Sequence, residues 1–97
     1  MPEFLDTLSI YYVCDAMAAT RPLDTAEMAG CMDVYERVKR HFLDAALKPF
    51  GTAERAEQMR RAYMDFVAWQ SANATLVADL RAAAAARLLE MVPARLR

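Results

Sequence analysis

Few residues of this 97-residue chain combine the type and spacing that chemistry requires. The one histidine, His41, precedes Asp44 by three positions, so a histidine base oriented by a carboxylate is conceivable. A histidine in this position is far more often an ordinary residue at the edge of a helix. The sequence contains no second histidine and no C-x-x-C pair, which excludes the common zinc and di-iron ligand sets. We therefore expect no catalytic residue, no metal and no cofactor, and we expect that the protein is not an enzyme.

Cys14 and Cys31 are the only two cysteines, too few for a disulfide framework. The amino-terminal residues lack the cationic region of a secretion signal, and no apolar run is long enough to span a membrane. We therefore expect a cytoplasmic protein in which both cysteines are buried thiols. A bridge between them would require an oxidising environment.

The composition favours an all-α fold in a single domain, residues 1–97. The chain is 57% hydrophobic and 26% charged with only two glycines, and it is rich in alanine, a strong helix former. Breakers and capping residues predict three helices, at about residues 3–19, 25–47 and 53–92. Asp24 and Glu27 have the spacing of a capping box, Pro49 and Gly51 end the second helix, and Thr52 caps the third.

The apolar pattern predicts which faces are buried. Residues of the second helix that follow helical spacing are expected to form its core stripe: Met28, Cys31, Met32, Tyr35, Val38, Phe42 and Ala46. The first helix is apolar on opposite sides, and the third would extend well beyond its neighbours if it is continuous. These surplus faces predict a homodimer with the following contact residues: Ile10, Val13, Met17, Val77, Leu80, Leu88 and Met91.

An alternative arrangement is a monomeric four-helix bundle. In this alternative the last helix breaks near residues 71–75, where several polar residues interrupt the apolar sequence, and its second half folds back. Asp15, Gln70 and Asn73 would lie at one height in a bundle. Because buried polar groups must pair, these three side chains are expected to form a hydrogen-bonded polar layer that sets register or oligomeric state.

Charge is distributed unevenly along the chain. Residues 1–36 contain seven acids and one base, a net charge of −6, and residues 37–97 contain eleven bases and six acids, a net charge of +5. The simplest interpretation is that the two halves attract each other in an antiparallel bundle. Alternatively, a basic corner within residues 37–61 could contact the phosphates of a nucleic acid; its members are Arg37, Arg40, Arg55, Arg60 and Arg61.

The sequence therefore favours a small helical protein-interaction module, a regulator of the adaptor, chaperone or inhibitor type. The all-round apolar first helix and the missing catalytic motifs support this prediction. A nucleic-acid-binding regulator that uses the basic corner is the alternative. The expected partner is another protein, including a second copy of the chain; a nucleic acid is less favoured, and no membrane partner is expected.

Overall fold

The computed structural model describes residues 2–91, and all the regular secondary structure in this part of the chain is helical. The four helices are α1 (Pro2–Thr20), α2 (Thr25–Arg40), α3 (Ala53–Ala72) and α4 (Ala74–Glu90). The predicted all-α class is confirmed. The first helix and the start of the second also agree with the sequence, within one residue at each boundary.

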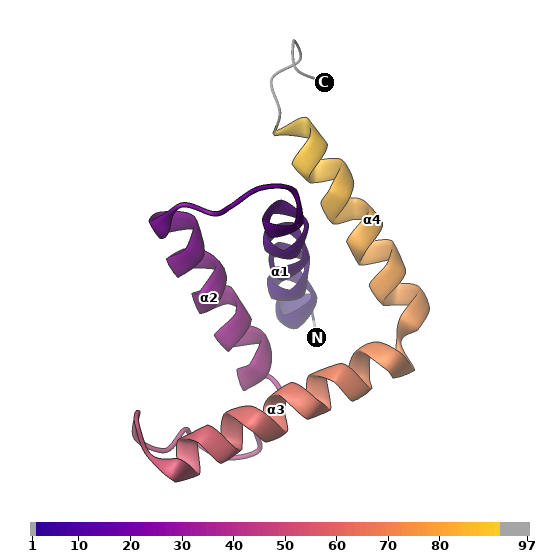
Figure 1. Ribbon diagram of the computed structural model, residues 1–97. Coiled ribbons are helices and arrows are strands. Elements are labelled where there is room, and N and C mark those ends of the chain that lie inside the picture. Colours follow the sequence, from indigo (N-terminus) through magenta and orange to yellow (C-terminus); the bar gives the residue numbers. More distant parts are fainter. Residues whose placement is uncertain (1, 92–97) are drawn as a thin grey trace.

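Helix α1 occupies the centre of the arrangement (Figure 1). It packs against α2 on one side and α4 on the other, and α3 crosses one end and connects the two outer helices. Within the described residues, no Cα atom of α2 comes within 8 Å of a Cα atom of α4. The two outer helices are therefore held together through α1 and α3, and each retains an uncovered side.

The core forms around three buried side chains of α1, which are Phe4, Leu8 and Tyr12. They pack in one cluster with residues from every other helix: Val38 of α2, Phe66 of α3, and Val77 and Ala84 of α4. Aromatic contacts close the end near α3, where the ring of Phe4 meets Trp69 edge-on with centroids 5.2 Å apart. Each outer helix is thus anchored on α1 by apolar burial, the dominant favourable term in folding.

The turn between α1 and α2 shows that local capping signals were predicted correctly. The Asp24 carboxylate accepts a hydrogen bond from the Glu27 backbone N–H, and the Glu27 carboxylate accepts one from the Asp24 N–H. Arg21 donates two further bonds to the same Glu27 carboxylate, at 2.9 and 2.7 Å. Thr52 likewise caps α3 by accepting from the Arg55 N–H. These bonds satisfy donors that a helix leaves unpaired at its start.

The predicted end of the second helix is wrong, because α2 ends at Arg40 and not near residue 47. The N–H groups of His41, Phe42 and Leu43 bond to carbonyls three residues back, which tightens the chain out of the α-helix. This turn places the half-buried Phe42 ring against the core, 5.6 Å from Phe4 between centroids. The chain therefore leaves the helix at Arg40 and packs Phe42 on the core, although the local sequence would allow α2 to continue.

The predicted continuous helix over residues 53–92 is also wrong. The chain breaks at Asn73, with φ −123° and ψ 40°, as in the four-helix alternative. The Asn73 side chain donates to the Trp69 carbonyl at 2.8 Å, and the Val77 N–H bonds to the Asn73 carbonyl at 2.9 Å, so α4 begins at once. The break costs about one or two hydrogen bonds of about 1 kcal/mol each. Folding α4 onto α1 compensates, since each buried Val or Leu contributes about 1.5–3 kcal/mol.

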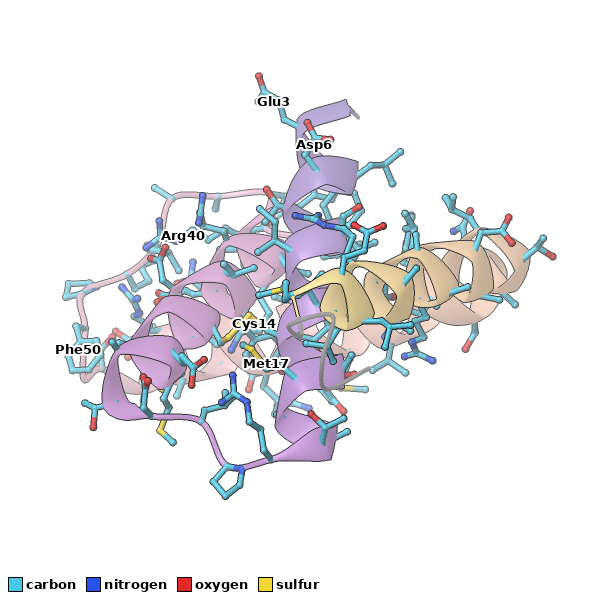
Figure 2. All side chains as sticks on the ribbon, turned by 90° about the horizontal axis from the view of Figure 1, so that it is seen from above. Glu3, Asp6, Cys14, Met17, Arg40 and Phe50 are labelled. Carbon is cyan, nitrogen blue, oxygen red and sulfur yellow. A yellow bond between two sulfur atoms is a disulfide. The ribbon has the colours of Figure 1, made fainter. Side chains whose placement is uncertain are left out.

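The expectation of two free thiols is wrong as well, because a disulfide joins Cys14 on α1 to Cys31 on α2, with Cα atoms 5.8 Å apart (Figure 2). The two cysteines lie at one height of the antiparallel α1–α2 hairpin, so no backbone adjustment is needed to join them. Disulfides persist in oxidising compartments and are rare in the cytosol. The cytoplasmic location that the sequence favoured stays a prediction.

We predict that replacing both cysteines (C14S/C31S) lowers the free energy of unfolding by about 3 kcal/mol, because the bridge closes a loop of 17 residues in the unfolded chain. Urea denaturation followed by circular dichroism measures this difference. The wild-type protein treated with a dithiol reductant serves as control and should show the same loss. Equal free energies of unfolding of the oxidised and reduced proteins would show that the bridge does not stabilise the fold.

A second prediction concerns the packing of α4 on α1. Leu80 lies half-buried against the core, so L80D removes apolar burial and dehydrates a carboxylate, at a cost of about 2 kcal/mol or more. The matched control is L89D on the same helix, where the leucine is 57% exposed and the change should stay within about 0.5 kcal/mol. Thermal unfolding of both variants tests this difference, and equal melting temperatures would argue against the α1–α4 packing.

Candidate functional site

The chain itself covers part of the contact surface that the sequence predicted. Met17 and Val77 are buried within the chain, and Val13, Leu80 and Leu88 are half-buried. For Met17 and Val77, the prediction that a second chain covers them is therefore wrong, since both are already buried within the chain, and Val77 packs in the core cluster around Leu8 and Tyr12 of α1. Ile10 and Met91 remain exposed.

The predicted polar layer is not formed. Gln70 pairs with α1 through a different residue, because its Oε1 accepts a hydrogen bond from the Tyr12 hydroxyl at 2.6 Å. Asn73 uses its side chain at the α3–α4 break, and Asp15 is exposed. The three side chains therefore do not bond to one another. The hydrogen-bond partner that the sequence analysis did not identify for Gln70 is Tyr12, a buried residue of α1.

The arginines of the predicted basic corner are paired within the chain, five guanidinium groups sharing three carboxylates. Each of its five arginines lies within salt-bridge distance of a carboxylate on its own or a neighbouring helix: Arg37–Asp33, Arg40–Glu36, Arg55–Glu36, Arg60–Glu57 and Arg61–Glu57. Three of these pairs, Asp33–Arg37, Glu36–Arg40 and Glu57–Arg61, have the i,i+4 spacing that stabilises a helix face. A phosphate group would have to compete with these carboxylates for every guanidinium.

His41 takes part in packing. Its ring stacks on Phe4 with centroids 3.8 Å apart, and burial lowers the pKa of the imidazole. Between residues 2 and 91, no three histidine, cysteine, aspartate or glutamate side chains gather closely enough to hold a metal ion. Among the helices described, none has both the length and the apolar character that a membrane crossing needs.

An open groove of about 200 Å³ lies between α1 and α2, beside the disulfide. We call it the α1–α2 groove, and it is lined by Tyr11, Cys14, Asp15, Ala18, Leu23, Met28, Cys31, Met32 and Tyr35. Met28 and Met32 expose 50% and 66% of their surface. The lining is mostly apolar, which is typical of a protein-docking surface.

The sequence assigned Met28 and Met32 to the core stripe of the second helix, and this assignment is wrong. The buried residues of α2 are Val34 and Val38, so the helix is rotated and both methionines face outward. Val34 could have indicated the buried face of α2, because it is a valine one helical turn before Val38. Periodicity alone fitted the methionine stripe equally well.

Aromatic side chains extend the apolar surface from the α1–α2 groove toward α3. The Tyr35 ring stacks on Tyr11 with centroids 5.5 Å apart, and the Lys39 ammonium lies 4.3 Å from the Tyr35 centroid. Burial raises the pKa of Tyr35, and the nearby Tyr63 phenol contributes. Because Tyr63 itself is half exposed, large apolar side chains of α2 and α3 adjoin one another at the surface.

A second groove, of about 480 Å³, separates the carboxyl-terminal parts of α1 and α4. Its lining is Ala16, Thr20, Arg21, Ala85, Leu88 and Leu89, which includes one residue of the predicted contact surface. Leu88 is half-buried here, and Leu89 is the large exposed side chain. Alanine and threonine make up half of this lining, whereas the α1–α2 groove offers two adaptable methionines and two tyrosines.

Comparison with known proteins finds no matching family model, no matching curated protein and no matching solved structure.

The electrostatics of the α1–α2 groove give a pH-dependent prediction. Burial, and then the negative charge of Asp15, raise the pKa of Tyr11 to about 12 from an ordinary value of 10. The folded protein therefore holds this proton more tightly than the unfolded chain. The contribution of Tyr11 to the free energy of unfolding is fully present below pH 10 and is lost as pH rises from 10 toward 12. Urea midpoints across this range measure the decline. Y11F should reduce the slope, and an unchanged slope would contradict the assignment to Tyr11.

Proposed function

We propose that this chain is a protein-interaction module that acts by binding another protein and not by catalysis. The observation that carries the proposal is the exposure of Met28 and Met32 in the α1–α2 groove, next to Tyr35. Methionine and aromatic side chains at a surface are costly to hydrate and well suited to binding. A regulator of the adaptor, chaperone or inhibitor type would use such a surface.

A second copy of the chain is one candidate partner. Ile10 and Met91, from the contact surface that the sequence predicted, are 44% and 64% exposed and remain available for a homodimer. The nucleic-acid alternative has less support, because the five arginines of the basic corner already lie against carboxylates.

Site-specific photo-crosslinking in the cells that make the protein tests the proposal. A photoreactive amino acid replaces Met32 in one variant and the exposed Ala83, on α4, in a control variant. We expect a discrete adduct larger than the chain from position 32 and none from position 83. An adduct of twice the chain mass would identify a homodimer.

Both positions are exposed, so neither variant should lose its fold. Circular dichroism confirms this before irradiation. The absence of any adduct at position 32, or equal adducts at both positions, would refute a docking role for the groove.

A further inference from the structure

We propose that the α1–α2 groove receives an amphipathic helix of a partner protein, with lysine or arginine beside its apolar stripe. This partner class rests on the proposed function. It is supported by the shape of the groove, by its methionines and by the charge of the helices that form it.

The groove has the form that a helix requires. It runs between two antiparallel helices, and Met28 and Met32 lie one turn apart on α2. Residues one turn apart on a helix are separated by about 5–6 Å, the same spacing as the anchors at i and i+4 of an incoming helix. Unbranched methionine side chains adjust to anchors of different shape.

The charge around the groove selects basic partners. Every lining residue lies within residues 11–35, which contain four acids and one base. That base, Arg21, is bound to Glu27 at 2.7 Å. Asp15 lies on the groove, is exposed, and has no ion pair or hydrogen bond with the described residues. Its carboxylate is available to a lysine or arginine from outside.

One end of the groove differs from the other, which orients the partner. Lys39 covers the ring of Tyr35 at one end, and Asp15 with Leu23 lies toward the other. The basic side chains of a bound helix would therefore concentrate at the end near Leu23. A lysine at the Tyr35 end would meet the Lys39 ammonium and be repelled.

A second copy of this chain fits the groove less well than a foreign basic helix. The five arginines of its basic corner already lie against three internal carboxylates, so docking through those arginines would compete with existing ion pairs. A helix with unpaired lysines incurs no such loss. Self-association is therefore an outcome that the experiment must distinguish.

The test uses the complete oxidised protein and three synthetic peptides of 16 residues. The first is an amphipathic Leu–Lys helix, the second has Glu in place of Lys, and the third is the Leu–Lys peptide in scrambled order. Calorimetry measures affinity. We expect the Leu–Lys helix to bind at least about tenfold more tightly than either of the others, because it alone satisfies both the apolar stripe and the charge.

Matched variants locate the binding site. M28S/M32S should weaken binding about tenfold through lost apolar contact. The control M64S removes a methionine of α3 that is 55% exposed and lies outside the groove, and it should change affinity less than twofold. D15N should weaken binding about threefold and reduce its dependence on salt.

The methionines also provide a direct spectroscopic readout. In a protein with labelled methionine methyl groups, bound Leu–Lys helix should shift the Met28 and Met32 signals and leave Met64 and Met91 unchanged. Shifts confined to Met91 would place the peptide at the α1–α4 end of the molecule and overturn the proposal. Equal binding of the scrambled peptide, or full affinity in M28S/M32S, would overturn it as well.

The two proposals fail separately. If no peptide binds but position 32 still crosslinks to a protein, the interaction module stands and the basic-helix partner is refuted. If the crosslinked partner is a second copy of this chain and sedimentation shows a dimer that excludes the peptide, the groove is a self-association site, and the basic-helix partner is again refuted.

Discussion

Helix α1 is apolar on two opposite sides, and burial of both sides determines where the remaining helices lie. Leu8 and Tyr12 face one way and Met17, nine positions after Leu8, faces the other, yet all three are buried. Both α2 and α4 pack on α1, and the side with Leu8 and Tyr12 meets Val38 of α2 together with Val77 and Ala84 of α4. The break at Asn73 follows from this constraint, because a straight helix after residue 53 would carry Val77 and Leu80 away from α1.

The same arrangement leaves the outer helices incompletely covered. Since α1 separates α2 from α4, neither outer helix can shield the other, and α3 closes only one end (Figure 1). The exposed methionines Met28 and Met32 therefore result from the way the core is built. A chain of this length can surround one central helix but cannot also bury every side of the helices around it.

Ion pairs between side chains link the helices at the surface, in addition to the apolar core. Glu36 lies against both Arg40 and Arg55, so one carboxylate links α2 to α3. Pairing of this kind fulfils part of the expectation that the acidic and basic halves attract each other, and it withdraws arginines from external ligands. Asp15 has no such partner among the described residues and lines the α1–α2 groove. A negative charge therefore lies beside the apolar side chains of that groove.

The sequence by itself determined the features that depend on a few neighbouring residues. Helical composition, the Asp24–Glu27 capping box and the Thr52 cap are all local, and all three are present. Only the tertiary structure decided the break at Asn73, the early end of α2, the Cys14–Cys31 bridge and the outward rotation of Met28 and Met32. Each of these reflects contacts between residues distant in sequence, where burial against α1 outweighs small local preferences that periodicity alone cannot rank.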